Sequence, residues 1–149
     1  MFAEAEFDAS ILWLDTLASL DFPEDVIEDS AERKIITKYT PIGVAVGIVP
    51  WNFPLQLACG KIAPALVAGN SFILKPSPFT PYGDIKLVEF GQKFFPPGVL
   101  QVLSGDDHLG PWLTEHSDVD KISFTGSTAT GKLVMKSASK TLKRVTLEL

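Results

Sequence analysis

Residues 50–54 have the sequence P-W-N-F-P and directly follow the apolar run Val44–Val49. An apolar run of this length predicts a buried strand, and the two prolines end it abruptly. Asn52 is therefore expected on a rigid turn, where its amide could donate a hydrogen bond to oxygen charge that develops on a substrate. The alternative is a packed turn without chemistry, in which Trp51 and Phe53 only fill the core.

Lys75 ends a second apolar run, Ser71–Leu74, and is followed by Pro76. The simplest interpretation is a solvated lysine at the end of a strand. In a nucleotide-binding crevice, however, its ammonium group could donate hydrogen bonds to ribose hydroxyl groups or to a phosphate.

Residues 124–132, F-T-G-S-T-A-T-G-K, predict a strand that leads into a helix. Small residues let the backbone approach a ligand, and the first amide groups of a helix favour an anion. This pattern indicates an anion-binding turn at Gly126 and Ser127. Alternatively, Ser127 and Thr128 are no more than caps of the helix, because hydroxyl groups are preferred at that position in any case.

The same segment also satisfies most of the P-loop pattern, through Gly126, Gly131 and Lys132. Leu133 occupies the position where that pattern requires the hydroxyl group that binds magnesium. This difference, together with the late position of the segment in the predicted sheet, argues against an NTPase.

Two further residues could take part in acid–base or covalent chemistry. Glu148 lies among apolar residues in the last predicted strand, where desolvation would raise the pKa of its carboxyl group and suit a general base. A carboxylate turned towards water is the simpler alternative. Cys59 lies in an apolar stretch without a histidine nearby in sequence, and we expect an inert core residue.

Apolar periodicity predicts an N-terminal helix over residues 5–20, followed by alternating strands and helices. A short strand is possible at Val26-Ile27, within the charged segment that follows the helix. The predicted strands are 35–40, 44–49, 71–74, 99–103, 121–124 and 144–149. The predicted helices between them are 54–68, 80–94, 108–116 and 127–139. Such alternation is typical of a parallel sheet that is covered on both faces.

Right-handed connections between these strands predict an α/β fold with a doubly wound open sheet. Ligands of such sheets bind at the carboxyl ends of the strands, where we expect Asn52, Lys75, Gly105 and the pair Gly126-Ser127. We divide the chain into residues 1–34, an N-terminal helix with a connecting segment, and residues 35–149, the sheet domain. Residues 144–149 are expected to form an open edge of the sheet, which favours association.

The composition of the chain excludes several classes of function. Its 149 residues carry a formal net charge of −5, and no basic run is longer than a pair, which argues against nucleic-acid binding. One cysteine and two scattered histidines offer no metal site and no disulfide framework, and they fit a reducing compartment. The acidic N-terminus lacks a targeting pattern, and no segment has the length of a membrane span. We therefore expect a cytoplasmic protein without a metal or a membrane partner.

Four motifs together resemble the NAD(P)-dependent aldehyde dehydrogenase superfamily. They are P-W-N-F-P at 50–54, F-I-L-K-P-S-P at 72–78, F-T-G-S-T-x-x-G at 124–131 and L-E-L at 147–149. The resemblance covers residues 35–149. It implies a Rossmann-like domain in which the cofactor phosphates meet a serine at the start of a helix rather than a G-x-G-x-x-G loop. It also implies oxidation of an aldehyde to a carboxylic acid with NAD or NADP, usually by a homo-oligomer.

The resemblance assigns roles to individual residues. Asn52 matches the amide that stabilises the oxyanion, and Glu148 matches the general base that activates the deacylating water. Val49 and Trp51 match the wall near the adenosine. Lys75 matches the ribose-binding lysine and Ser127 the pyrophosphate contact. The full set of implied cofactor contacts is Val49, Pro50, Trp51, Lys75, Ser77, Gly105, Gly126, Ser127 and Gly131.

Two departures from the family pattern stand out. Pro78 replaces the acidic residue that is common in NAD-preferring members, so the choice between NAD and NADP stays open. In the family a thiolate attacks the aldehyde, and its cysteine lies downstream of the glutamate, beyond Leu149. We therefore expect a fragment or a truncated gene product without turnover of its own. A dinucleotide-binding module or an inactive remnant remain the alternatives, and the sequence does not indicate which aldehyde is used.

Overall fold

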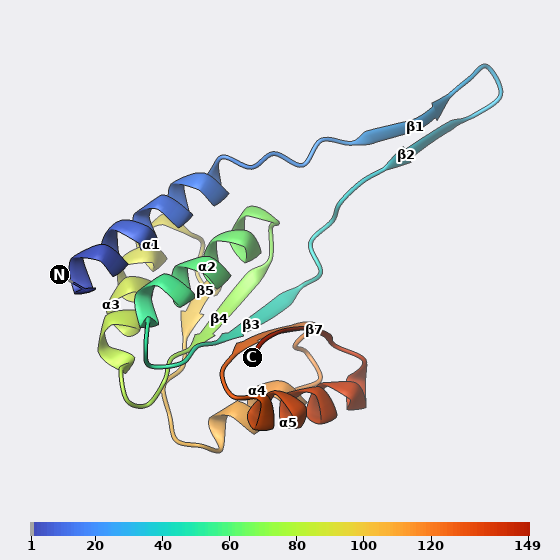
Figure 1. Ribbon diagram of the computed structural model, residues 1–149. Helices are drawn as coiled ribbons and strands as arrows, with labels where there is room; N and C mark the ends of the chain where they lie inside the picture. The colour runs from blue at the N-terminus through green and yellow to red at the C-terminus, as the bar shows by residue number, and fades with distance from the viewer. Residues whose placement is uncertain (1) are drawn as a thin grey trace.

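The computed structural model describes residues 2–149, and Met1 of the expected N-terminal segment lies outside this range. Its centre is a five-stranded sheet in which all neighbouring strands run parallel (Figure 1). The strands are β3 (Val44–Ile48), β4 (Ser71–Lys75), β5 (Leu100–Val102), β6 (Lys121–Thr125) and β7 (Arg144–Glu148). Their order in the sheet is β5-β4-β3-β6-β7. The first strand of this sheet along the chain, β3, is thus its middle strand, and later strands are added outward on both sides, which confirms the predicted doubly wound sheet.

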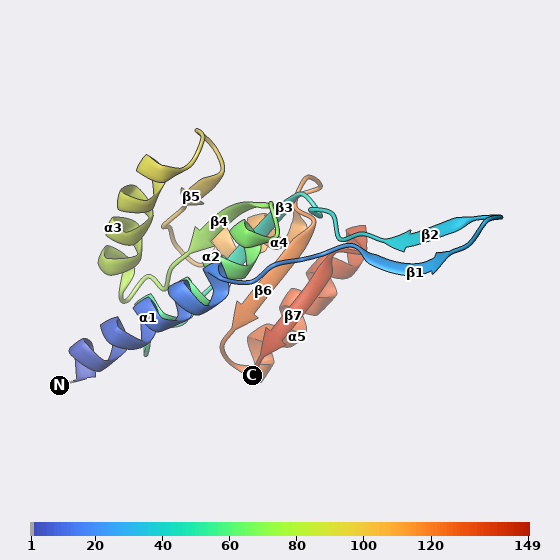
Figure 2. The same cartoon turned by 90° about the horizontal axis from the view of Figure 1, so that it is seen from above.

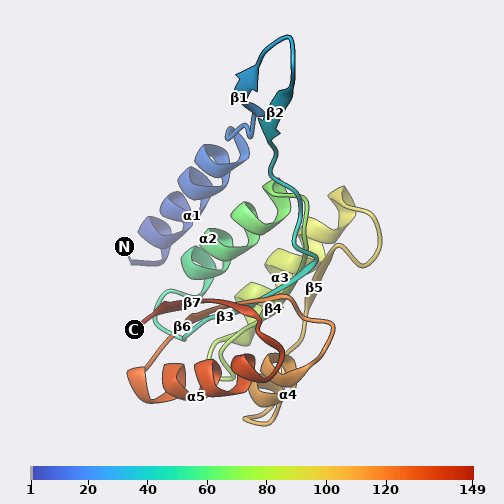
Figure 3. The same cartoon turned by 90° about the vertical axis from the view of Figure 1, so that its right-hand side faces the viewer.

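Helices cover both faces of the sheet (Figure 3). One layer holds α2 (Pro54–Val67) and α3 (Pro81–Gly91), and α1 (Phe2–Ala18) packs against α2. The opposite layer holds α4 (Leu109–Glu115) and α5 (Thr128–Ala138), which contact each other. Short 3₁₀ turns follow α3 at Gln92–Phe94 and α5 at Ser139–Thr141. The expected N-terminal helix is therefore confirmed, although it begins and ends earlier in the chain than predicted.

Alternating side chains of the strands build one apolar core on each face of the sheet. Ala45 of β3 packs with Phe72 and Leu74 of β4 beneath α2 and α3, whereas Val46 packs with Ile122 of β6 beneath α4 and α5. Because both faces of these strands are buried, β3 and β4 consist mainly of apolar residues, and β6 places apolar residues at alternate positions. This explains why the positions of β3, β4 and β6 could be predicted closely.

Gly47 on the middle strand leaves room for the buried ring of Phe72, because a Cβ atom at Gly47 would overlap that ring. Gly47→Ala is therefore expected to lower the free energy of unfolding by about 2–3 kcal/mol through overpacking of the core. Urea unfolding followed by circular dichroism measures this loss. Gly110→Ala in α4 is the matched control, since the added methyl group meets only Cε of Lys75 at 4.0 Å. Equal stability of the two variants would contradict the prediction.

A two-stranded antiparallel sheet projects from the body between α1 and β3 (Figure 2). It consists of β1 (Asp25–Asp29) and β2 (Lys34–Thr37), and ion pairs join Arg33 to Glu28 and Lys34 to Asp29. The short strand at Val26-Ile27 is confirmed. The strand expected over residues 35–40 is present only as β2 and does not belong to the parallel sheet, because Ile35 and Ile36 are exposed rather than packed on the core.

The hairpin of β1 and β2 crosses the boundary expected between residues 34 and 35, and that division of the chain stays a prediction.

At the other end of the fold, β7 is the last strand in the sheet order, which confirms that residues 144–149 lie at an edge of the sheet. Helix α2 ends at Val67, and Gly69 and Asn70 follow its C-cap residue, Ala68. Gly69 has a φ of 80°, and the amides of Gly69 and Asn70 donate to the carbonyl groups of Leu66 and Ala65.

Candidate functional site

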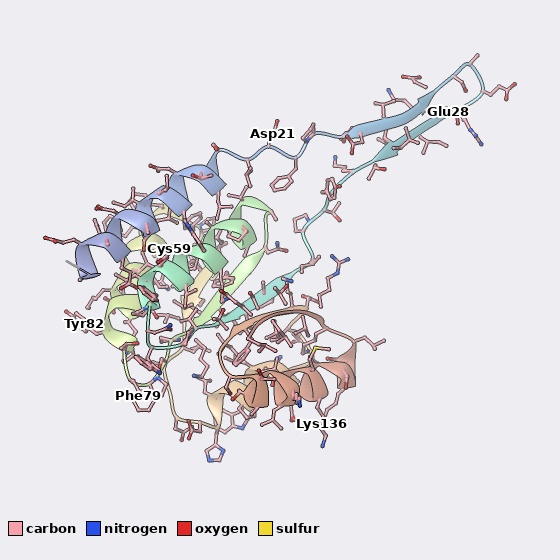
Figure 4. The ribbon with its side chains drawn as sticks, viewed as in Figure 1. Asp21, Glu28, Cys59, Phe79, Tyr82 and Lys136 are labelled. Atoms are coloured by element: carbon pink, nitrogen blue, oxygen red, sulfur yellow. The ribbon has the colours of Figure 1, made fainter. Side chains whose placement is uncertain are left out.

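A cleft of about 990 Å³ opens at the carboxyl ends of β3, β4 and β6 and extends between α4 and α5. It lies where the winding of the sheet changes direction, which is where open α/β sheets bind their ligands. Seven of the nine expected cofactor contacts line it: Val49, Pro50, Trp51, Lys75, Ser77, Gly126 and Ser127. Phe79 and Lys136, which also line the cleft, are labelled in Figure 4.

The turn after β3 forms one wall of the cleft. Val49 is buried, and its amide donates to the carbonyl group of Lys75 over 3.2 Å, which ties the turn to β4. Trp51 is 61% exposed and Phe53 is 45% exposed. The alternative in which these rings only fill the core is therefore wrong, and Trp51 offers the cleft an aromatic surface on which a planar group can pack. Asn52 follows as an exposed residue and is not part of the cleft lining.

Lys75 forms the second wall and is only 8% exposed, so it is not a solvated strand end. Its Nζ atom donates to the carbonyl oxygen of Pro76 over 3.2 Å. Burial lowers the pKa of Lys75, and the nearby carboxylate of Asp107 acts in the opposite direction. An ammonium group in such a partly desolvated place interacts more strongly with a ligand hydroxyl or phosphate than one in water.

Gly126 and Ser127 form the third wall, between β6 and α5. Ser127 is the N-cap of α5, and its Oγ atom accepts a hydrogen bond from the amide of Thr130 over 3.2 Å. A Cβ atom at Gly126 would overlap the ring of Phe124, so only glycine lets the backbone follow this path. The start of this 11-residue helix combines amide donors with the positive end of the helix dipole, which favours an anion.

Much of the remaining lining comes from α4, α5 and the segments next to them, and these residues were not predicted from the sequence. Thr114 and Ser137 share a hydrogen bond of 2.8 Å across the two helices. Glu115 accepts a hydrogen bond of 2.7 Å from Lys140, and this contact lowers the pKa of Glu115. Asp107, which faces Lys75, comes from the loop before α4. These contacts join segments that are far apart in the sequence, and no motif in the chain signals them.

Two expected cofactor contacts lie outside the cleft lining. Gly105 is exposed in the loop after β5, where its nearest neighbour is the side chain of Leu109. Gly131 is buried in α5, and the side chain of Leu149 fills the space beside it. Its position is explained by close packing of α5 on the end of β7.

Glu148 also lies outside the cleft, and its side chain is 65% exposed rather than enclosed by apolar residues. Its Oε2 atom accepts a hydrogen bond of 2.8 Å from Thr125 and lies 4.0 Å from Nζ of Lys61. Burial lowers the pKa of Lys61, while the charge of Glu148 acts in the opposite direction. Lys61 is therefore a partner of the expected base that the sequence analysis missed, although a single lysine in the apolar run 54–68 was a signal for it.

Cys59 is 1% exposed. Figure 4 labels this residue on α2, where α1 runs alongside. Burial raises the pKa of its thiol to about 11, which confirms the expected core residue. Across residues 2–149 we find no cluster of three or more His, Cys, Asp or Glu side chains suited to hold a metal ion. Within the same range, no helix has the length and apolar character needed to cross a membrane.

The sequence pattern of the aldehyde dehydrogenase family matches residues 3–149. The chain belongs to the aldehyde dehydrogenase family. It is 55% identical over 146 residues to a putative aldehyde dehydrogenase, FUS7, of Gibberella fujikuroi, which covers 98% of the chain. It is 50% identical over 114 residues, 76% of the chain, to betaine aldehyde dehydrogenase of Vibrio vulnificus. The expected resemblance is thus confirmed.

Solved structures of aldehyde dehydrogenases share the fold. Lactaldehyde dehydrogenase from Escherichia coli superposes on 99% of the chain with a TM-score of 0.92 and 32% identity. PnpE, solved with nicotinamide adenine dinucleotide, superposes on 97% with a TM-score of 0.87 and 41% identity. The family comprises oxidoreductases that use NAD or NADP. The chain spans about a quarter to a third of the length of these proteins: 32% of FUS7, 24% of the betaine enzyme, 32% of lactaldehyde dehydrogenase and 30% of PnpE.

Proposed function

We propose that these residues form the cofactor-binding part of an enzyme that oxidises an aldehyde to a carboxylic acid with NAD or NADP. The observation that carries the proposal is the convergence of Trp51, Lys75 and Ser127 on one cleft. An aromatic surface, a partly desolvated cation and a helix N-terminus fit the base, ribose and phosphate groups of a dinucleotide. The P-loop NTPase alternative is dropped, because the chain belongs to a family of another class.

In this proposal a bound dinucleotide would supply the hydride acceptor, and the protein residues bind and orient the reactants and move protons. Lys75 donates hydrogen bonds to ribose hydroxyl groups, and the amide groups that begin α5 hold the pyrophosphate next to Ser127. Asn52 donates to the substrate oxygen as negative charge develops on it. Glu148 takes the proton from the water that releases the acid, and the Lys61 ammonium group lies 4.0 Å from its carboxylate.

The proposal also covers the choice between NAD and NADP, the cellular location, the substrate and the oligomeric state. Position 78 is proline, which places no carboxylate near the ribose and therefore no repulsion against a 2′-phosphate. We expect both NAD and NADP to bind. The cysteine of the described chain is free and buried, which supports a reducing compartment, and we infer a cytoplasmic enzyme. The substrate of the complete enzyme is a small-molecule aldehyde, and members of the family are usually homo-oligomers.

Isothermal titration with NAD and with NADP tests the proposed cleft. Lys75→Met is expected to weaken dinucleotide binding about tenfold or more, the factor for loss of a charge-assisted hydrogen bond. Lys86→Met is the matched control, because Lys86 lies on α3 outside the cleft and pairs with Glu89 over 2.6 Å. Failure of the unaltered chain to bind either dinucleotide, or equal affinities of the two variants, would refute the proposal.

A further inference from the structure

The first turn of α2 lacks a cap from its own segment. Its N-cap residue, Phe53, makes no side-chain capping bond, and Pro54 has no amide hydrogen. The amide of Leu57 donates to the carbonyl group of Phe53 over 3.1 Å. The amides of Leu55 and Gln56 therefore need an acceptor from elsewhere, because buried backbone donors are costly when unpaired.

Glu6 of α1 supplies this acceptor. Its Oε1 atom accepts hydrogen bonds from the amides of Leu55, over 2.9 Å, and Gln56, over 3.3 Å. The carboxylate thus reaches across 49 and 50 residues of sequence to cap a different helix. Both bonds are charge-assisted, and a negative charge at this end of α2 also interacts favourably with the helix dipole.

The position of Glu6 is itself fixed by packing of α1 on α2, which run side by side in Figures 1 and 3. Ser10 is 5% exposed, and its hydroxyl group donates to the carbonyl oxygen of Glu6 over 2.7 Å. The ring of Trp13 lies so close to Gly60 of α2 that a Cβ atom there would overlap it. The Glu6 side chain is thus presented by a docked helix and not by a free segment.

We propose that Glu6 is a positioning residue that fixes the start of α2 and thereby the turn that carries Trp51 and Asn52. The roles of those two residues rest on the proposed function. The turn ends directly at the first residue of α2, and Pro50 and Pro54 make it a stiff connection. A shift of the first turn of α2 is therefore transmitted to the cleft wall rather than absorbed by the connection.

Amide hydrogen exchange measured by NMR on the full chain tests the capping contact residue by residue. Glu6→Ala is expected to accelerate exchange at Leu55 and Gln56 about tenfold or more, while exchange at Ile122 in the sheet stays as in the unaltered chain. Glu6→Gln retains an acceptor oxygen and is expected to restore most of the protection. Asp8→Ala removes an exposed acid from the same helix and is expected to change neither amide.

Titration of the same variants with NAD tests the positioning role. We expect Glu6→Ala to weaken binding severalfold, Glu6→Gln to recover most of the affinity and Asp8→Ala to bind as the unaltered chain does. If Glu6→Ala does not fold, Glu6→Asp replaces it. This variant keeps the charge but shortens the reach by one methylene group, and it is expected to lose protection at the same two amides.

Two results for Glu6→Ala would overturn the proposal: unchanged exchange at Leu55 and Gln56, or an acceleration there that is no greater than at Ile122. The same holds for Glu6→Asp if that variant is used instead. Binding of NAD by the variant used with the affinity of the unaltered chain would overturn the positioning role alone. If the unaltered chain binds no dinucleotide, the proposed function fails, and the exchange measurement still decides whether Glu6 fixes the start of α2.

Discussion

Replacement of Asp84 by asparagine is expected to raise the free energy of unfolding at pH 8 by as much as about 4 kcal/mol, and to change it little at pH 4. Asp84 lies in the first turn of α3 with 0% exposure, and neither carboxylate oxygen has a hydrogen-bond partner among the described residues. Burial, with a smaller effect from the charge of Glu6, raises the pKa of Asp84 from 3.8 to about 7. A carboxylate near a helix N-terminus is normally favoured, but here the cost of desolvation is larger.

The direction of the pH dependence follows from proton binding. Between pH 3.8 and about 7 the folded chain keeps a proton on Asp84 that the unfolded chain releases. The stability therefore falls as the pH rises through this window, and the loss is complete above the folded-state pKa. Asparagine has almost the same shape and no proton to lose, so it removes this dependence.

Urea unfolding at pH 4, 6 and 8 measures the effect. The unaltered chain and Asp84→Asn are expected to be similar at pH 4 and to diverge progressively towards pH 8. Asp15→Asn is the control, because it makes the same substitution at an exposed position on α1 and leaves the buried carboxyl group of Asp84 in place. A constant difference between the chain and Asp84→Asn at the three pH values would show that Asp84 is not held protonated in the folded state.

The fold was predictable where the sequence itself carries the burial pattern. Strands β3 and β4 are mainly apolar, β6 has apolar residues at alternate positions, and proline, lysine or glycine stands at or just after the end of each strand. Their alternation with helices predicts the doubly wound sheet that the structure has. Strand β2 shows the limit of this reasoning. Ile35 and Ile36 favour an extended backbone, but their sequence does not specify a partner, and they pair with β1 instead of the parallel sheet.

The candidate site was predictable only in part, because local sequence patterns do not specify which distant segments meet. The rule that ligands bind at the carboxyl ends of strands identified Lys75 and Ser127, which line the cleft. It specifies an edge of the sheet but not a position along that edge, and Asn52 and Gly105 follow strands without lining the cleft. The bridge between Thr114 and Ser137 and the cap from Glu6 join helices distant in sequence, which no local pattern could indicate.

Alkylation of Cys59 by iodoacetamide at pH 8 is expected to be about 100-fold or more slower in the folded chain than in the chain unfolded by urea. Only the thiolate reacts, and a pKa of about 11 leaves roughly a thousandth of the thiol ionised at pH 8, against about a quarter for a free cysteine. Desolvation is the main cause, and the charges of Asp84 and Glu6 add to it. Mass spectrometry of samples taken over time gives both rates.

The raised pKa of the Cys59 thiol also matters for the proposed reaction, because the nucleophile of that reaction must be a thiolate. The 149 residues contain one cysteine, and its thiol is buried and almost entirely protonated. We therefore expect these residues to bind the dinucleotide but to form no NADH from NAD and an aldehyde, with Cys59→Ser indistinguishable from the unaltered chain. Aldehyde-dependent NADH formation that Cys59→Ser abolishes would make this thiol the nucleophile. Formation that survives Cys59→Ser would exclude thiolate attack by any cysteine of these residues, and the hydride would then have to leave an adduct of another kind.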